Sequence, residues 1–144
     1  MRIRKATLSD LSAIGRISNK YRFEQNRDWR EAISAKGSRM FLLVEGKGIM
    51  GFTGLVDSDW NETIRIMDVF VDPKYRERGL GLRLVNSMIQ KAKKTKYRCL
   101  IAEAPSLSNV VGLYKKAGFR KCGYNDRYYS NHGKEIALWM SLDL

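Results

Sequence analysis

The residues that most clearly suggest chemistry lie between Tyr75 and Val85, in the stretch YRERGLGLRLV. Gly79 and Gly81 stand just before an apolar pattern of helical spacing, with arginines around them. The first N–H groups of a helix have no partner inside the helix and lie at the positive end of its dipole, so they can bind an anion. Glycine lets such a ligand approach closely because it has no Cβ. The stretch predicts a site for a phosphate-bearing ligand; an ordinary helix start is the alternative.

Two well-known nucleotide motifs are not matched by this stretch. A Walker A loop requires GxxxxGK[ST], which the chain lacks, and in a dinucleotide fingerprint GxGxxG the third glycine would stand where Leu84 is found. The sequence therefore supports neither of these two nucleotide-binding classes.

Metal chemistry is not expected. His132 is the one histidine of the chain, and it lies in a polar Asn-His-Gly stretch that is typical of an exposed turn. Cys99 and Cys122 are far apart, and one histidine with two scattered cysteines does not make a zinc site. Apolar, strand-like neighbours favour reduced, buried thiols over a disulfide.

The composition limits the classes of protein to which the chain can belong. It has 144 residues, of which 44% are hydrophobic, and a net charge of +12. Such a charge attracts nucleic acid, acidic protein, anionic lipid or a polyphosphate cofactor, although a solvated basic surface explains it equally well. No apolar run approaches the ~18 to 20 residues of a membrane span, and the first twenty residues do not resemble a signal peptide. We expect a cytoplasmic protein that is not bound to a membrane.

The elements that must position the glycines alternate between strand and helix patterns in the order β-α-α-β-β-β-α-β-α-β-β. This order predicts the α/β (α+β) class: one domain over residues 1–144, with a mixed, twisted sheet of about six to seven strands and about four helices. Ser9 or Asp10 is expected to cap the first helix, Asp28 the second, and Ser106 or Ser108 the last. Strands are expected over Arg2–Ala6, Met40–Gly46, Ile49–Val56, Thr63–Val71, Tyr97–Ala104, Phe119–Tyr124 and Ile136–Leu142.

With its neighbours, the glycine stretch matches a family motif. Val71 to Gly81 reads VDPKYRERGLG and resembles the acetyl-CoA-binding motif of the GNAT superfamily of N-acetyltransferases, [RQ]-x-x-G-x-[GA], with Arg76, Gly79 and Gly81 in the defining places. Residues 3–14, IRKATLSDLSAI, are similar to the first strand and helix of that family, and residues 113–119, LYKKAGF, to its late LYxKxGF signature. The resemblance covers essentially the whole chain.

The resemblance implies acetyl-CoA as cofactor and a sheet whose central strands splay apart. The pantetheine arm would lie in that opening like an added strand, and the pyrophosphate would rest on the first N–H groups of the helix. In the family an asparagine usually stands where this chain has Leu107, so Ser108 or Asn109 is expected to replace it. The expected cofactor-binding residues are Val69, Phe70, Val71, Arg76, Glu77, Arg78, Gly79, Leu80, Gly81, Leu82 and Asn109.

The resemblance also implies direct attack of an amine on the thioester. Tyr114 is the expected proton donor to the departing thiolate, because its ordinary pKa of ~10 is close to that of a thiol. Glu103 is the leading candidate for the base, Asp68 the second, and water the third; a backbone N–H near Phe70 or Val71 could stabilise the oxyanion. Without the family pattern, Tyr114 reads as a packing residue, and the alternative for either acid is a surface or salt-bridged carboxylate.

The acceptor is the least defined part of the prediction. The segments Tyr21–Trp29 and Tyr124–His132 are expected to line its site, with Tyr21, Trp29 and Tyr128 in contact with it. Three tyrosines in the second segment resemble those of the ribosomal-protein and N-terminal alanine acetyltransferases, which favours the α-amine of a protein N-terminus over a small-molecule amine. A basic rim of Arg22, Arg27, Arg30 and Arg127 would discourage polyamines.

Two other classes stay open at this point. A catalytically inactive acyl-CoA sensor would share the cofactor motif. A basic RNA- or ribosome-binding module would explain the charge, but Lys91, Lys93 and Lys94 lack the interleaved aromatic residues of such modules, so a nucleic-acid partner is less favoured. An exposed edge strand near Ile136–Leu142 would allow a homodimer.

Overall fold

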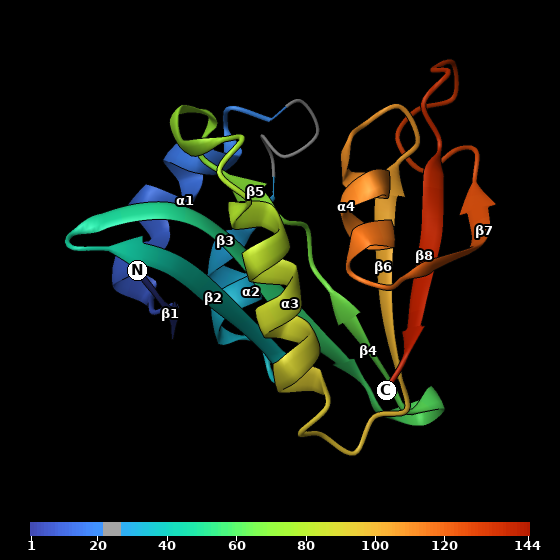
Figure 1. Ribbon diagram of the computed structural model, residues 1–144, viewed down its shortest axis with the longest axis horizontal. Coiled ribbons are helices and arrows are strands. Elements are labelled where there is room, and N and C mark those ends of the chain that lie inside the picture. Colours follow the sequence, from blue (N-terminus) through green and yellow to red (C-terminus); the bar gives the residue numbers. More distant parts are fainter. Residues whose placement is uncertain (22–26) are drawn as a thin grey trace.

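A computed structural model describes residues 1–21 and 27–144 of the chain. These residues form one mixed sheet in the order β1-β2-β3-β4-β6-β8-β7, with the short β5 beside β3 (Figure 1). The class is as predicted. The strands are β1 (Arg2–Lys5), β2 (Ser38–Glu45), β3 (Gly48–Ser58), β4 (Thr63–Ile66), β5 (Phe70–Val71), β6 (Cys99–Pro105), β7 (Arg120–Asn125) and β8 (Ala137–Asp143), and the α-helices are α1 (Leu11–Ser18), α2 (Trp29–Ser34), α3 (Leu80–Ala92) and α4 (Val110–Lys116).

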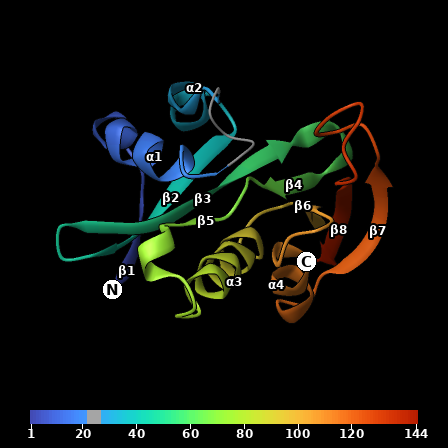
Figure 2. The ribbon, with the colours of Figure 1, turned by 90° about the horizontal axis from the view of Figure 1, so that it is seen from above.

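The helices cover the two faces of the sheet unequally. Helices α1 and α2 lie over one face of its N-terminal half, whereas α3 and α4 lie on the opposite face (Figure 2). The apolar stripe of α3, at helical spacing, is buried against the sheet, because six of its thirteen residues face inward: Leu80, Leu84, Val85, Met88, Ile89 and Ala92. In the described part of the chain, no helix has the length and apolar character needed to cross a membrane.

The observed helix caps match the predicted ones only in part. The Asp28 carboxylate accepts a hydrogen bond from the N–H of Glu31 at 3.1 Å and caps α2 as predicted. Asp10 does not cap α1 through its side chain. Its carboxylate instead accepts from the Thr7 N–H at 2.8 Å and pairs with Arg4 at 2.8 Å, which holds its pKa down at about 2. This interaction fixes the start of the α1 segment to strand β1.

The third predicted strand, Thr63–Val71, is two strands in the structure, which accounts for an eighth strand beyond the six to seven expected. Leu55 of β3 pairs with Ile66, and Phe52 pairs with Phe70. Residues 53 and 54 of β3 therefore lie opposite three residues, 67–69, of the segment between β4 and β5. One extra residue on one of two paired strands defines a β-bulge. The bulge reverses the side-chain alternation, since Ile66 packs under α3 and α4 whereas Phe70 packs under α1 and α2.

The bulge marks the point where the sheet opens. Strand β4 pairs with β6 in parallel over only three residues, 63–65. Beyond that point β5 stays with β3, and β6 continues with β8, so the two central strands diverge (Figure 1). This is the splayed arrangement that the resemblance implied.

The far edge of the sheet differs from the prediction. Strand β8 pairs with both β6 and β7, so the segment near Ile136–Leu142 is not an exposed edge. The outermost strand is β7, which carries a register shift between Lys121 and Gly123. Such irregularities protect a strand edge from pairing with another chain, so the predicted basis for a homodimer is absent from β8.

The approach of β5 to β3 depends on Gly51. A Cβ at this position would lie 2.4 Å from the carbonyl oxygen of Phe70 and 3.3 Å from Cδ1 of Leu84. We expect Gly51→Ala to lower the free energy of unfolding by about 1–3 kcal/mol, because the strand or helix must shift to admit the methyl group. Urea denaturation measures the change.

The matched control is Gly15→Ala, which lies in α1 with nothing within 4 Å of the added Cβ. This change should leave stability equal or slightly higher, since alanine favours a helix. Equal stability of the two variants would contradict the role of Gly51.

Candidate active site

A cleft of about 700 Å³ lies between β5, the N-terminal turn of α3 and helix α4. Nine of the eleven residues predicted to bind the cofactor line it, and the exceptions are Phe70 and Arg78. The phenyl ring of Phe70 stacks on Phe52 in the core on the opposite face, which leaves only its backbone near the cleft. The lining residues are Tyr21, Val69, Val71, Tyr75, Arg76, Glu77, Gly79, Leu80, Gly81, Leu82, Asn109, Val110, Gly112, Leu113 and Lys116.

The turn that leads into α3 is shaped for close approach to a ligand. Gly79 is the N-cap of α3 with φ at +70°, and Glu77 also has a positive φ, +61°. A non-glycine residue in this left-handed conformation stores about 1–2 kcal/mol of strain, and such strain is typical of ligand-binding turns. A Cβ on Gly81 would lie 3.4 Å from Cδ2 of Leu113 on α4. Gly81 therefore keeps the passage between α3 and α4 open.

The backbone edge of β5 faces the cleft and is occupied by one side chain. The hydroxyl of Tyr21 donates to the Val71 carbonyl at 2.5 Å and accepts from the Val71 N–H at 3.2 Å. The guanidinium of Arg76 lies over the same tyrosine ring, 5.2 Å from its centroid. Tyr21 was predicted to contact the acceptor, but the structure places its hydroxyl on the strand edge where the pantetheine arm was expected.

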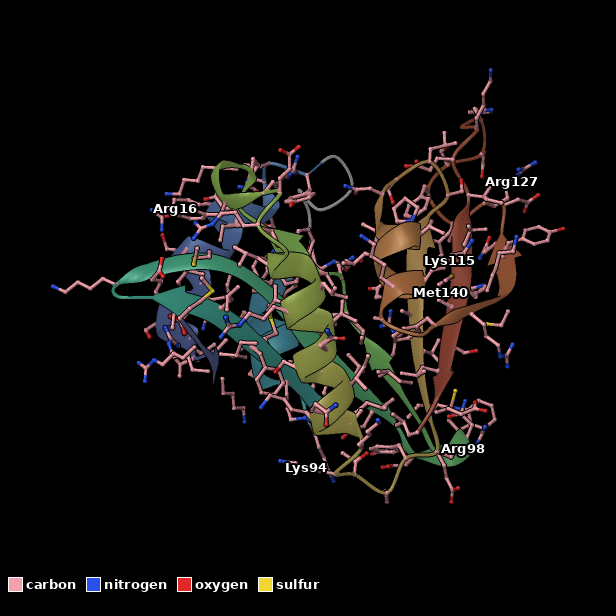
Figure 3. The ribbon with its side chains drawn as sticks, viewed as in Figure 1. Arg16, Lys94, Arg98, Lys115, Arg127 and Met140 are labelled. Carbon is pink, nitrogen blue, oxygen red and sulfur yellow. The ribbon has the colours of Figure 1, made fainter. Side chains whose placement is uncertain are left out.

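One segment of the chain, which begins at the turn before α3, carries most of the positive charge of the protein. Residues 78–125 contain eleven lysines and arginines and one acidic residue, Glu103, so this segment carries +10 of the net +12. It includes α3 and α4, which lie side by side on one face; Figure 3 marks Lys94 just after α3 and Lys115 on α4. Ten of the eleven cations are exposed. A polyanionic ligand is attracted to such a face.

The buried carboxylate Glu103 lies on β6 and contacts Arg65 of β4. Only 7% of the Glu103 surface is exposed, and its Oε1 lies 3.5 Å from Nη1 of Arg65. The other oxygen, Oε2, is buried without a hydrogen-bond partner among the described residues. Burial raises the pKa of Glu103; the Tyr128 hydroxyl and Arg65 oppose the rise, and Asp68 adds to it. A buried carboxylate with an unused oxygen is suited to accept a proton from a bound amine.

Tyr114 is fully buried on α4, with its ring packed against Phe119 at 5.2 Å between centroids. Burial raises its pKa well above 10, and the charges of Asp68 and Glu103 raise it further. The phenol therefore stays protonated at neutral pH. Its packing partners are on the α4 face of the sheet, whereas Glu103 alternates with Ala102 and Ala104 and projects to the other face. Neither Tyr114 nor Glu103 is among the residues that line the cleft.

Of the other predicted residues, Asp68 interacts electrostatically with Glu103, whereas Trp29 lies in the core. The Asp68 carboxylate forms an ion pair with Arg27, so the second candidate base already has a cationic partner. Trp29 is buried against Phe52 and donates to Ser18, so it belongs to the core and not to the surface of an acceptor site.

Tyr128 is 42% exposed and packs edge-on against Trp139 and Tyr129 near Glu103, where an acceptor could reach it. Of the predicted basic rim, Arg30 and Arg127 are exposed and Arg22 lies outside the described residues, as does the stretch 23–26.

Arg65 and Lys116 are among the residues of the site that sequence reasoning missed. Arg65 occupies an outward-facing position of β4, but its meeting with Glu103 depends on the register between β4 and β6. Lys116 lines the cleft from α4 and is the second lysine of the LYKKAGF segment, where its identity could have been noticed.

Comparison with known proteins agrees with this geometry. The family model described as an acetyltransferase (GNAT) domain matches residues 9–136. The chain belongs to the GNAT acetyltransferase family. Streptothricin acetyltransferase of Streptomyces lavendulae is 29% identical over 109 residues, which are 73% of this chain and 58% of that protein. The [ribosomal protein bS18]-alanine N-acetyltransferase of Escherichia coli K12 is 30% identical over 81 residues, 55% of each protein. The matched region thus spans a little over half of these relatives.

Solved structures confirm the GNAT fold. The ribosomal-protein-S18-alanine N-acetyltransferase of Escherichia coli superposes with a TM-score of 0.86 at 23% identity, over 99% of this chain and 92% of that chain. The ribosomal-protein-alanine N-acetyltransferase of Brucella melitensis gives 0.84 at 21% identity over the whole of both chains. A Bacillus anthracis protein assigned as a streptothricin acetyltransferase gives 0.83 at 22% identity, over 99% of this chain and 98% of that chain, and its structure was solved in complex with acetyl coenzyme A.

The hydrogen bonds between Tyr21 and Val71 lead to a prediction about coenzyme A in this GNAT protein. A pantetheine amide that binds the same N–H and carbonyl must first displace the tyrosine hydroxyl. Tyr21→Phe removes that competitor, so we expect the Kd for coenzyme A to fall about 3- to 10-fold, the equivalent of one net hydrogen bond. Isothermal titration calorimetry measures the change.

Tyr97→Phe is the matched control, because the Tyr97 hydroxyl bonds Asp59 at 2.6 Å in a part of the protein that does not line the cleft. Its affinity should equal that of the parent. Weaker binding by Tyr21→Phe would show that the hydroxyl contacts the cofactor instead of competing with it.

Proposed function

We propose that this chain, acting as one acetyltransferase domain over residues 1–144, transfers the acetyl group of acetyl coenzyme A to a primary amine. The observation that carries the proposal is the divergence of β5 from β6, with the cleft beside β5 on one face of the sheet and the buried Glu103 carboxylate of β6 on the other. A thioester in that opening would be accessible to an amine from the Glu103 side. Membership of the GNAT family supports the same chemistry.

The cofactor would be held by backbone groups along the cleft. The Val71 N–H and carbonyl would accept the pantetheine arm as an added strand, and the N–H groups of the α3 turn, residues 79–82, would receive the pyrophosphate. Arg76 and Lys116 line the cleft and would contribute charge. Asn109 is the N-cap of α4 and lines the same wall, so it can stand in for the asparagine that the family places at position 107.

The reaction needs no covalent enzyme intermediate. The amine nitrogen attacks the thioester carbonyl, its proton passes to Oε2 of Glu103 directly or through water, and the carbon–sulfur bond breaks to release the thiolate. Both acids have an arginine partner, and Glu103 is preferred to Asp68 as the base because it is the more buried of the two and its Oε2 has no hydrogen-bond partner among the described residues. The raised pKa of Glu103 brings it nearer to neutrality, where a general base is most effective.

Tyr114 would act on the sulfur as a hydrogen-bond donor. Sequence reasoning matched its acidity to that of a thiol, but burial raises the pKa of the phenol well above that of a thiol, about 8.5. Complete proton transfer from Tyr114 to the thiolate would therefore be unfavourable. A hydrogen bond from the protonated phenol still stabilises the charge that develops on the leaving sulfur.

We propose the α-amine of a protein N-terminus as the acceptor. An α-amine, with a pKa of ~8, costs about 1 kcal/mol to deprotonate at pH 7, whereas a lysine-like amine costs about 4.6 kcal/mol. A single buried base such as Glu103 is better matched to the smaller cost. The named ribosomal-protein-alanine acetyltransferases among the relatives and structural neighbours support this class, and Tyr128 lies where it could contact a peptide.

A small-molecule amine is the second candidate. The matched region of the Streptomyces lavendulae streptothricin acetyltransferase covers 73% of this chain, more than the 55% matched by the Escherichia coli enzyme. An antibiotic amine would enter from the same open face as a peptide.

The role of Tyr114 is tested by Tyr114→Phe, which retains the ring that packs against Phe119. We expect kcat to fall about 10²-fold or more with an unchanged Kd for coenzyme A, because the lost interaction exists only with the departing sulfur. Tyr97→Phe is again the control, and its kcat should be that of the parent. An unchanged kcat in Tyr114→Phe would exclude this residue from the reaction.

The acceptor class is tested by following release of coenzyme A thiol with a panel of amines. Peptides that begin with Ala or Ser should give a kcat/KM at least about tenfold above spermidine and streptothricin, since their amine is more readily neutral. Faster turnover of streptothricin would select the second candidate. Absence of turnover with intact coenzyme A binding would leave a sensor and overturn the proposed activity.

A further inference from the structure

Arg65 and Glu103 are brought together by the short parallel pairing of β4 and β6. Arg65 lies opposite Ile101, and Glu103 follows two residues later on the same face of β6. The Arg65 side chain reaches along that face to Oε1 at 3.5 Å. This pairing ends where the strands diverge, so Arg65 is the last β4 residue in register with β6 before the opening.

The contact leaves the two carboxylate oxygens in different states. Oε1 faces the guanidinium, whereas Oε2 is buried with no hydrogen-bond partner in the described residues. An unsatisfied buried carboxylate oxygen is costly, so such atoms in native proteins call for an explanation, such as a catalytic role. The Arg65 side chain is 42% exposed, which shows that the pair is not sealed inside the core.

We propose that Arg65 is a positioning residue for acetyl transfer: it holds Oε1 of Glu103 and keeps the carboxylate charged, so that Oε2 is available to the amine of the acceptor. This inference rests on the proposed function, in which Glu103 is the base. Arg65 does not touch the reacting atoms; it acts through Glu103.

The groups around Glu103 determine the sign of the effect. Arg65 and Arg27 favour the charged carboxylate, as does the hydroxyl of Tyr128, whereas burial and Asp68 disfavour it. Tyr114, on the other face of β6, and Tyr129 also interact electrostatically with Glu103: burial raises the pKa of each tyrosine first, and the charge of Glu103 raises it further. Loss of the Arg65 charge removes a favourable interaction, so the pKa of Glu103 must rise. Because the base acts only when ionised, the loss of activity on acidification would then begin at a higher pH.

The test compares the acidic limb of the kcat/KM profile in the parent, Arg65→Met and Arg65→Lys, with one acceptor peptide throughout. The amine of the acceptor titrates identically with each enzyme, so differences between profiles report on the protein. We expect Arg65→Met to move the limb up by about one pH unit and to recover most of its rate at high pH. Arg65→Lys keeps the charge and should restore the limb to within about 0.3 units of the parent.

Arg39→Met is the matched control. Arg39 also pairs with a partly buried carboxylate, Asp57 at 2.7 Å, but on β2 and β3 away from the cleft lining. The same chemical change there should leave the acidic limb in place. Equal stability of the Arg65 and Arg39 variants, measured by denaturation, would show that a shifted limb does not come from unfolding.

A second measurement keeps the inference separate from the proposed function. Carbon-13 NMR of the Glu103 carboxyl follows its titration without turnover, and Arg65→Met should raise its midpoint by about one unit. A carboxyl midpoint that moves while the kcat/KM limb stays, or a midpoint that does not move, would overturn the role of Arg65 in an otherwise active enzyme. A parent without acetyl transfer to any amine would overturn the proposed function itself, and the inference with it.

Discussion

One extra residue between β4 and β5 determines the shape of this site. Where two residues of β3 face residues 67–69, the ladder is interrupted and the side-chain alternation reverses, so that Phe70 anchors β5 in the core under α1 and α2. The strand cannot then continue beside β6, and the sheet opens. Gly51 permits the close approach of β3 and β5 that fixes the bulge in place. The cleft is thus a consequence of strand pairing and not of a flexible loop.

The diverging strands lie between two environments with different chemistry. On the α3 and α4 face the cleft is lined by Arg76, Lys116 and the glycine-containing turn before α3, which suits a polyphosphate ligand. On the opposite face a carboxylate, two tyrosines and the Arg65 and Arg27 cations form a partly buried cluster, which suits an amine. Acetyl transfer needs these two ligands to meet at one carbon atom, and the opening in the sheet is where they can do so. The Tyr21 hydroxyl on the edge of β5 would make the protein exchange one set of hydrogen bonds for another when the cofactor enters.

Much of the fold and most of the residues that line the cleft could be predicted from the sequence, because both depend on local patterns. The apolar stripe of α3, the Asp28 cap and the glycines before α3 are encoded within a few residues of one another. The bulge could not be predicted, since it depends on how β3 and β4 align and leaves no composition signal. The same holds for Arg65 beside Glu103, for Tyr21 beside Val71 and for the inner position of β8, which all arise from pairing between distant segments. Trp29 was expected on the surface of the acceptor site because aromatic residues serve both cores and ligand sites, and only packing distinguishes the two.

The central claim is that the β5 edge and the first turn of α3 together receive coenzyme A. Titration of the nitrogen-15-labelled protein with coenzyme A, followed by amide NMR, tests it most directly. The account predicts the largest shifts at the amides of Val71 and residues 79–82, with little change in α2 and in β7. The account would be contradicted if saturating coenzyme A left those amide resonances unshifted, or shifted mainly the resonances of other parts of the sheet.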